Sequence, residues 1–453
     1  MIRNNSKYVK ENDIFICTHD DYEDRHKYVD NIKKASAIII DKEISNKTNI
    51  PLIKVKDTND TFFQVYNDIY RKPLKDLNLI GITGTDGKTT TAYIIRELLD
   101  NIEDTAYLGT IGLIYKDKKI DTPNTTVSVD KFLEYASILK KENIKNLVME
   151  VSSEGLLHNR CDNLRFKRTI ITNVTGDHLN IHKTFENYLN SKLKLFDLLD
   201  NDAIAIINID DISYKYIKSK KVKKITYGFN KKADYRIIDY KLTNQKTTFT
   251  LKYKNNIYKI ESPLLGKFNI YNLTAAIATI NSLGINIEKI IELIKEITPI
   301  PGRLNVFKTK NNSNLILDYA HTINATKSIL EFANSTKQGN IITVVGCAGG
   351  REKEKRKDIG KIVTENSDKV IFTMDDPRYE KVKDIVNQML QKVNKDNFIY
   401  MKNRKKAIKK AIDMSKENDT ILILGKGTDN YMAIKNKYKK YNDLNEIKKY
   451  TKN

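Results

Sequence analysis

The sequence predicts an α/β protein of three domains, and three observations lead to this fold class. A chain of 453 residues is too long for one ordinary core, since a domain averages about 150 residues. Short apolar runs alternate with amphipathic helical stretches, which is typical of sheets covered by helices. Breaks in this pattern fall near residues 75 and 300. We therefore expect domains at residues 1–75, 76–300 and 301–453.

The N-terminal region has the pattern of a small α/β domain. Residues 14–16 and 37–40 are the apolar runs Ile-Phe-Ile and Ala-Ile-Ile-Ile, which predict two strands between charged helical stretches. Pro73 ends this pattern.

The central region opens with an apolar run at residues 77–82, followed by a glycine-rich turn and a helical pattern at residues 91–99. Strand, turn and helix in this order begin a parallel sheet. Further buried strands are predicted at residues 146–149, 169–172 and 203–207, and appended antiparallel strands between residues 235 and 262.

The C-terminal region starts where Pro299, Pro301 and Gly302 interrupt the helical pattern of residues 287–297. Apolar runs separated by helical stretches then return, which predicts a second doubly wound sheet. Its strands are expected at residues 315–317, 341–345, 370–372 and 421–424.

Composition excludes several classes of protein. The net charge is +22, but the lysines are dispersed among Asn, Ile, Asp and Glu, so an ordinary solvated surface explains the charge better than nucleic-acid binding. Cys17, Cys161 and Cys347 lie far apart and predict neither disulfides nor a zinc site. No apolar stretch reaches the roughly 18 residues of a membrane span, and no apolar signal segment follows Met1. We expect a cytoplasmic monomer without membrane insertion or a nucleic-acid partner.

The most specific motif lies where the first central strand passes into a helix. Glycines there let successive backbone N–H groups converge on phosphate oxygens, and the helix N-terminus adds positive potential. Lys88 can bridge phosphates and the Thr89 hydroxyl can bind Mg²⁺. The spacing departs from the strict phosphate-loop pattern, because Ile82 stands at the first glycine position. The predicted nucleoside triphosphate site comprises Gly84, Thr85, Asp86, Gly87, Lys88, Thr89 and Thr90.

Residues 83–91, Thr-Gly-Thr-Asp-Gly-Lys-Thr-Thr-Thr, resemble the phosphate loop of the Mur ligases, which usually have Asn at the position of Asp86. Residues 149–156 and 172–182 are similar to the members that add the third residue of the cell-wall peptide. The resemblance covers all three regions and is weakest before residue 77. It implies a central P-loop ATPase-type sheet and a C-terminal Rossmann-like sheet. It also implies a ligase of peptidoglycan synthesis that uses ATP and an acyl phosphate to extend UDP-MurNAc-L-Ala-D-Glu.

By this resemblance, the catalytic residues are Lys88, Glu150, His178 and Lys192. Thr89, Glu150 and His178 would bind Mg²⁺ together with Lys192, which the family carries as a carbamate. Carbamylation turns a cation into an anion that can bind metal. Outside the family match, Lys192 reads as an ordinary lysine on a helix surface.

The resemblance also implies contacts to both substrates. Asn269, Arg303 and Asp318 would bind the nucleotide, which implies that the C-terminal domain closes over ATP. The UDP-sugar is assigned to the N-terminal domain through Ser6 alone, because Asn-Ser-Lys stands at residues 5–7 where the family has Asp-Ser-Arg. The remaining expected contacts are Asn124, Thr125, Thr126, Ser152, His158 and Arg160 to the dipeptide, and Arg351, Asp375, Asp376, Pro377, Arg378, Gly425 and Asp429 to the incoming amino acid.

Arg378 favours meso-diaminopimelate over L-lysine, because a guanidinium can hold a distal carboxylate in a bidentate manner. Asp376 replaces the family's usual Asn, and Asp429 its usual Glu, so lysine or another amino acid stays open. Glu154 stands where the family has His. Two further alternatives are a folylpolyglutamate-type peptide ligase on the same scaffold and a non-catalytic P-loop regulator. The regulator needs no second metal site, so Glu150, His178 and Lys192 speak against it.

Overall fold

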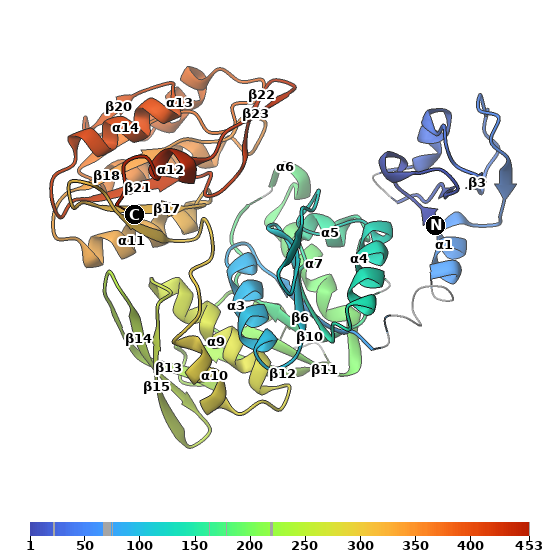
Figure 1. Ribbon diagram of the computed structural model, residues 1–453, viewed down its shortest axis with the longest axis horizontal. Coiled ribbons are helices and arrows are strands. Elements are labelled where there is room, and N and C mark those ends of the chain that lie inside the picture. The colour runs from blue at the N-terminus through green and yellow to red at the C-terminus, as the bar shows by residue number, and fades with distance from the viewer. Residues whose placement is uncertain are drawn as a thin grey trace.

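The computed structural model describes residues 1–452 apart from 21–22, 67–73, 75, 163, 178 and 218–220. It has three α/β domains, each built around its own sheet (Figure 1). Pro73 and the candidate ligand His178 lie outside the described residues. Among the described residues, no helix has both the length and the apolar character that crossing a bilayer requires.

The N-terminal domain is a four-stranded parallel sheet in the order β1-β2-β3-β4. The two strands expected from apolar runs are β2 and β3. Arg3 joins this domain to helix α4 (Val129–Lys141) of the central domain, with its guanidinium 3.2 Å from Glu134 and 3.8 Å from Asp130. The elements are β1 (Ile2–Arg3), η1 (Ser6–Tyr8), β2 (Ile14–Ile16), η2 (Arg25–Asn31), β3 (Ala37–Ile40), β4 (Leu52–Lys54) and α1 (Thr58–Tyr66).

The central domain has an eleven-stranded sheet in the order β15-β14-β13-β12-β11-β10-β5-β9-β6-β7-β8. Strands from β12 to β6 are parallel, whereas β13–β15 and β6–β8 pair antiparallel at the two edges. The strands are β5 (Asn78–Thr83), β6 (Thr105–Gly109), β7 (Gly112–Tyr115), β8 (Lys118–Ile120), β9 (Asn146–Glu150), β10 (Phe166–Ile171), β11 (Leu199–Asn208), β12 (Lys223–Gly228), β13 (Tyr235–Leu242), β14 (Thr247–Tyr253) and β15 (Asn256–Ser262).

Helices cover both faces of this sheet because its central strands are apolar throughout. Successive side chains of a strand point to opposite faces. Leu79 accordingly packs towards α4, whereas Ile80 and Ile82 pack towards α3 and α9. The helices are α3 (Lys88–Asp100), α4 (Val129–Lys141), α5 (Ser153–Leu157), α6 (Leu179–His182), α7 (Phe185–Leu193), η4 (Lys194–Leu198), α8 (Tyr214–Ile217), α9 (Lys267–Asn281) and α10 (Ile287–Ile294).

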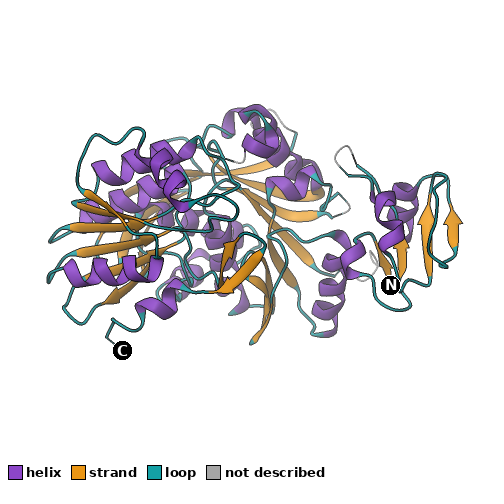
Figure 2. Ribbon diagram, turned by 90° about the horizontal axis from the view of Figure 1, so that it is seen from above, coloured by secondary structure: helices purple, strands orange, loops and turns teal. Residues whose placement is uncertain are grey.

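The C-terminal domain is a six-stranded sheet in the order β16-β17-β21-β18-β19-β20, parallel except for β16, with helices on both faces (Figure 2). All four strands expected from apolar runs are present. The hairpin β22–β23 stands apart from this sheet. The elements are β16 (Asn305–Lys308), β17 (Asn314–Asp318), α11 (Ile323–Thr336), β18 (Ile341–Val345), α12 (Lys355–Glu365), β19 (Lys369–Phe372), α13 (Val382–Leu390), β20 (Phe398–Tyr400), α14 (Arg404–Met414), β21 (Thr420–Leu424), β22 (Tyr431–Ile434), β23 (Lys437–Lys440) and α15 (Asp443–Ile447).

Candidate functional site

The glycine-rich turn connects β5, in the middle of the central sheet, to α3. Gly84 has no room for a side chain, since a Cβ there would lie 1.9 Å from Thr172 Oγ1. Gly87 has φ +83 directly before the helix, a conformation that favours glycine. The Lys88 ammonium donates to the carbonyl oxygens of Gly84 and Thr85, both at 2.9 Å, and so lies folded over the loop. Burial lowers the pKa of Lys88, although the nearby Glu150 opposes this effect.

Glu150 reaches the phosphate loop because its strand is a neighbour of β5. In the β5–β9 pairing Ile82 lies opposite Glu150, so both strands end at the same edge of the sheet. Glu150 Oε2 accepts from the Thr89 hydroxyl at 2.9 Å. Its Oε1 accepts from the Thr110 backbone N–H at 2.9 Å and from the Tyr107 hydroxyl. A carboxylate and a hydroxyl thus face the loop, and both are oxygen donors suited to Mg²⁺.

Lys192 is fully buried on α7 and is not the surface lysine that its helix alone suggests. Its ammonium donates to Gly84 O at 2.8 Å and lies 4.4 Å from the centre of the Tyr188 ring. Burial lowers its pKa well below the usual value, and the charge of Lys88 acts in the same direction. Both effects act against the charged form of this amine. Within the described residues, no group of three or more His, Cys, Asp or Glu side chains could hold a metal ion.

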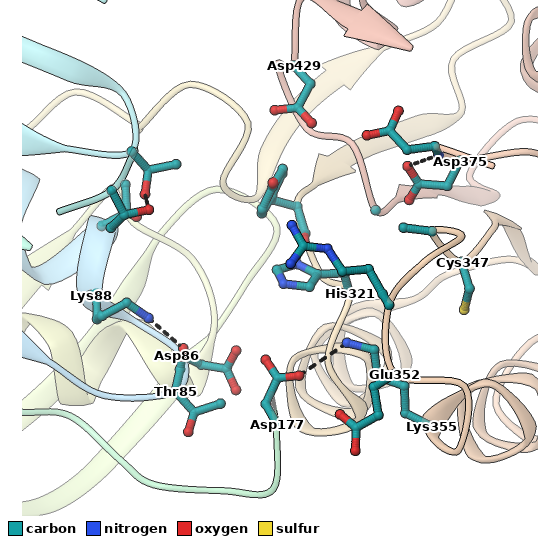
Figure 3. Close-up of a pocket in the computed structure, with 18 of the residues that line it drawn as sticks. Thr85, Asp86, Lys88, Asp177, His321, Cys347, Glu352, Lys355, Asp375 and Asp429 are labelled. Carbon is teal, nitrogen blue, oxygen red and sulfur yellow. Dashed lines mark hydrogen bonds and ion pairs between the residues drawn. The ribbon is translucent and has the colours of Figure 1, made fainter. Parts of the chain in front are cut away.

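A cavity of about 320 Å³ joins this loop to the C-terminal domain. Figure 3 shows Thr85, Asp86 and Lys88 on one side of it and Asp375, Asp429 and Cys347 on the other. Three polar contacts connect the two domains around this space. Lys355 lies 3.2 Å from Asp177, the Thr322 hydroxyl donates to Asp86 at 3.1 Å, and the Arg303 guanidinium lies 3.5 Å from the Thr89 hydroxyl.

A second cavity, of about 570 Å³, adjoins the phosphate loop on the side of α9 and β13. Aromatic rings and amide groups line it, a combination that can stack and hydrogen-bond a base. The residues concerned include Tyr227, Tyr240, Phe268, Tyr271, Asn173, Asn208 and Asn272.

Of the three nucleotide residues predicted outside the phosphate loop, two line this second cavity and one does not. Arg303 lines it with its guanidinium over the Tyr319 ring, and Asp318 lines it while accepting from the backbone N–H groups of Leu304 and Ala320, both at 2.7 Å. Asn269 is buried, and its amide is bonded to Leu265 O at 2.7 Å and to Asn272 at 3.0 Å. Asn272 does line the cavity, and its amide is bonded to Thr91 at 3.1 Å and to Asn269 at 3.0 Å.

The predicted amino-acid residues gather where β19 and β21 end. Asp375, Asp376, Arg378 and Asp429 line the first cavity together with Arg351 and Gly425, whereas Pro377 is buried and does not line it. Lys426, for which the sequence suggested no role, has no exposed side-chain surface and lies 2.8 Å from Asp376, 3.5 Å from Asp429 and 3.8 Å from Asp375. Burial, together with Asp375 and Asp376, raises the pKa of Asp429 to about 6 even though Lys426 opposes this shift.

Arg404 fixes the two loops that carry these carboxylates. Its guanidinium donates to Leu424 O at 2.8 Å and to Met374 O at 3.4 Å, and it is paired with the buried carboxylate of Asp443 at 2.7 Å. The sequence around Arg404 does not indicate this role, because the residues that Arg404 binds lie 20 to 39 positions away.

The predicted dipeptide residues form a hydrogen-bonded group beside Glu150. The Thr126 hydroxyl accepts from the Ser152 N–H at 2.8 Å, and Arg160 donates to Thr126 O at 2.9 Å. The Thr125 hydroxyl lies 3.0 Å from that of Thr110 and lines the first cavity. Asn124 is exposed, and His158 is half-buried at the end of α5. Ser6 lies in the separate N-terminal domain, within η1, and lines neither cavity.

Comparison with known proteins gives a consistent result. Models of the Mur ligase middle domain and of the Mur ligase glutamate ligase domain match residues 82–280 and 302–427. UDP-N-acetylmuramoyl-L-alanyl-D-glutamate–2,6-diaminopimelate ligase 2 of Clostridium acetobutylicum is 37% identical over 440 residues, which are 95% of this chain and 90% of that protein. The corresponding ligase of Clostridium botulinum is 36% identical over 447 residues, with coverages of 96% and 92%.

Solved structures agree in fold. A structure of a UDP-N-acetylmuramoyl-L-alanyl-D-glutamate–2,6-diaminopimelate ligase has a TM-score of 0.67 and 26% identity, covering 99% of this chain and 93% of that one. The MurF ligase of Thermotoga maritima in complex with ADP has a TM-score of 0.67 at 20% identity, covering 93% of each chain. From the three-domain fold, the phosphate loop with its buried glutamate and the similarity over nearly the full length, we conclude that this chain belongs to the Mur ligase family.

Proposed function

We propose that this protein is an ATP-dependent ligase that adds meso-diaminopimelate to UDP-MurNAc-L-Ala-D-Glu in peptidoglycan synthesis. One observation carries the proposal: a single cavity runs from Lys88 and Thr89 of the phosphate loop to Asp375, Arg378 and Asp429. A phosphate-activated carboxylate and an incoming amino acid can therefore meet in it. The names of the full-length relatives in the two Clostridium species describe this reaction.

ATP is proposed to place its base in the second cavity and its phosphates at the loop, since Asp86, Gly87 and Arg303 line both spaces. Thr89 and Glu150 would hold Mg²⁺ through a hydroxyl and a carboxylate. The metal would supply positive charge to the transferring phosphoryl group. Asn272, which lines the cavity, is proposed to lie nearer the base than Asn269, although its amide is itself bonded to Thr91 and Asn269.

Lys192 is proposed to be carbamylated. Carbamylation requires the neutral amine, which attacks CO₂ to give a carbamate and release a proton. Burial and the adjacent Lys88 favour that neutral amine by lowering the pKa of Lys192. The resulting anion would place a charge opposite to that of the Lys88 ammonium, and oxygen donors, beside the loop. His178 is retained as a proposed partner of this second metal site on family resemblance alone.

The acceptor is proposed to lie along Thr125, Thr126, Ser152 and Arg160, with Asn124 and His158 at the edge of this group. The γ-phosphoryl group of ATP is transferred to a carboxylate of the D-glutamyl residue, giving an acyl phosphate and ADP. Attack by the neutral amine forms the C–N bond, breaks the C–O bond to phosphate and releases inorganic phosphate and a proton. Lys88 and Arg303 would stabilise the charge on the phosphoryl oxygens.

The charges at the amino-acid loops favour a diamino dicarboxylic acid. The carboxyl groups of Asp375, Asp376 and Asp429 share one buried ammonium group, that of Lys426. Amino groups of the substrate would pair with carboxyl groups that Lys426 does not neutralise. Arg378 is half-buried at the cavity and its guanidinium makes one long contact, 3.5 Å from Gly350 O, so it remains available for a distal carboxylate; Arg351 is exposed nearby. L-Lysine has the two ammonium groups but no second carboxylate.

The reaction should be tested with purified protein, ATP, Mg²⁺, UDP-MurNAc-L-Ala-D-Glu and either meso-diaminopimelate or L-lysine. We expect ADP, phosphate and a tripeptide product of the diaminopimelate mass, with far less lysine product. ATP hydrolysis that does not depend on the UDP-linked dipeptide would contradict the ligase proposal. Because both nucleotide substrates are made inside cells, we propose a cytoplasmic site of action. A monomeric enzyme is a separate proposal.

A further inference from the structure

The carboxylate of Asp376 faces the cavity but is bonded to the protein. Its Oδ1 accepts from the buried Lys426 ammonium at 2.8 Å and from the backbone N–H of Ala433 at 3.0 Å. The backbone of the same residue is also engaged, with its N–H donating to Asp375 Oδ1 at 2.7 Å and its carbonyl accepting from Gly349 at 2.8 Å. Only 14% of its side chain is exposed.

These bonds join three segments that are separate in the sequence. Asp376 belongs to the loop after β19, Lys426 to the loop after β21, and Ala433 to strand β22 of the hairpin. The first two loops carry Asp375 and Asp429, whose carboxylates line the cavity. Asp376 Oδ1 thus accepts hydrogen bonds from both the loop after β21 and strand β22, and so ties both of them to the loop after β19.

Arg378 depends on the same hairpin for its backbone conformation. Its φ is +49, a left-handed conformation that a residue other than glycine adopts only when its surroundings hold it. Arg378 N donates to Ala433 O at 3.0 Å, and Lys435 N donates to Arg378 O at 2.8 Å. Ala433 therefore binds Asp376 through its N–H and Arg378 through its carbonyl, which couples the two residues.

Lys426 lies beneath the cavity surface and contacts the carboxylates from the protein interior. It has no exposed side-chain surface and does not line the cavity, so it cannot touch a substrate there. Burial alone would lower the pKa of this ammonium, but Asp375 and Asp376 raise it above the usual value. A buried ammonium needs a partner, because an unpaired charge in the protein interior is strongly destabilising.

We propose that Asp376 is a positioning residue for the incoming amino acid: its carboxylate, held by Lys426 and Ala433, aligns Arg378 and Asp429 without itself binding the substrate's ammonium group. This inference rests on the proposed function only for the identity of the substrate. A positioning role also explains why residue 376 is Asp where the family usually has Asn, since the carboxylate pairs with the Lys426 ammonium. Asp429, bonded less closely to Lys426 at 3.5 Å and more exposed, remains the carboxylate that faces the amine.

A matched pair of variants separates positioning from direct contact. Asp376→Asn and Asp429→Asn each remove one negative charge from the same cavity. An Asn at 376 still offers an Oδ1 acceptor to both Ala433 and Lys426. We therefore expect Asp376→Asn to keep the KM for diaminopimelate within about threefold, whereas Asp429→Asn raises it about tenfold or more through loss of a charge-assisted contact.

Asp376→Leu removes the acceptor altogether and tests the positioning role directly. We expect it to raise the KM for diaminopimelate about tenfold or more while the KM for ATP stays unchanged, so that Asn, but not Leu, supports normal recognition. Equal KM increases in Asp376→Asn and Asp429→Asn would show direct contact and overturn the proposal. A near-normal KM in Asp376→Leu would overturn it as well.

Thermal unfolding provides a readout that does not depend on activity or on the identity of the substrate. Asp376→Leu removes the nearest of the three carboxylates around the buried Lys426 ammonium and should lower Tm by roughly 5–10 °C. Adding Lys426→Met should restore a large part of this loss, because the pair is then replaced by apolar groups. Additive losses in the double variant would contradict the pairing. If wild-type protein joins no amino acid to the UDP-linked dipeptide, the proposed function fails, while this unfolding cycle still decides whether Asp376 holds the loops.

Discussion

Replacing Arg378 by Ala should separate diaminopimelate from lysine as substrates. The Arg378 guanidinium makes one long contact to the residues that the structure describes, 3.5 Å from Gly350 O, so its truncation removes little from the protein's own contacts. Ala has a Cβ, as Arg does, so the substitution does not change the backbone restriction at φ +49, and we expect the left-handed conformation to remain. The change in binding therefore reports chiefly on the contact to substrate.

The expected magnitude follows from the loss of one charge-assisted contact. Such a contact contributes about 1.5–3 kcal/mol, which corresponds to an increase of about 10- to 150-fold in the KM for meso-diaminopimelate. L-Lysine lacks the distal carboxylate, so its KM should change by no more than about threefold. Phosphate release measured against the concentration of each amino acid gives both values.

Two control variants sharpen this test. Arg378→Lys keeps the charge but loses the planar fork, and should lie between wild type and Arg378→Ala. Tyr379→Ala changes the next residue, whose side chain is 74% exposed, and should behave as wild type. Equal changes for both amino acids, or a wild-type preference for lysine that Arg378→Ala leaves untouched, would refute the assignment of Arg378 to the distal carboxylate.

Three further predictions concern the phosphate loop and the acidic pocket. Lys88→Ala should abolish release of ADP and phosphate with all substrates present while leaving circular dichroism unchanged; near-normal turnover in the folded variant would contradict the ATP site. Lys192→Ala should be inactive and partly recover with short-chain carboxylates, which can supply the missing metal oxygens, and unchanged activity would exclude a role for the carbamate. Because the pKa of Asp429 is raised to about 6, its carboxylate gains a proton as the pH falls through that value. The kcat/KM for the amino acid should therefore drop below about pH 6, and Asp429→Asn should remove this acidic limb of the profile, whereas a persisting limb would assign it to another group.

The strands that position the site could be predicted because they are buried on both faces. The runs at residues 146–149 and 341–345, for example, became β9 and β18 with boundaries changed by one residue at most. Strands β22 and β23 were missed, because Lys437–Lys440 is fully exposed and carries no apolar alternation. That hairpin is held by contacts to residues more than 50 positions away, such as Asp376, which local pattern cannot reveal.

In the candidate site too, local sequence predicts some features, whereas others depend on how the chain folds. Residues of the phosphate loop are contiguous, so their common role could be predicted from spacing alone. Asn269 and Asn272 lie three positions apart on one helix, and the sequence could not decide which of them points to the cavity. Lys192 needed the fold to distinguish a buried amine from the neighbouring exposed Lys194, since both belong to the same lysine-rich stretch.

The three polar contacts between the central and C-terminal domains have a thermodynamic consequence. Thr89, Asp86 and Asp177 line the cavity at the phosphate loop, and each is bonded to the C-terminal domain. Wherever a nucleotide replaces one of these contacts, its observed affinity is the intrinsic affinity reduced by the stability of that contact. Weakening Lys355–Asp177, by substitution or by salt, would then change the apparent Kd for nucleotide without any change in the groups that touch it.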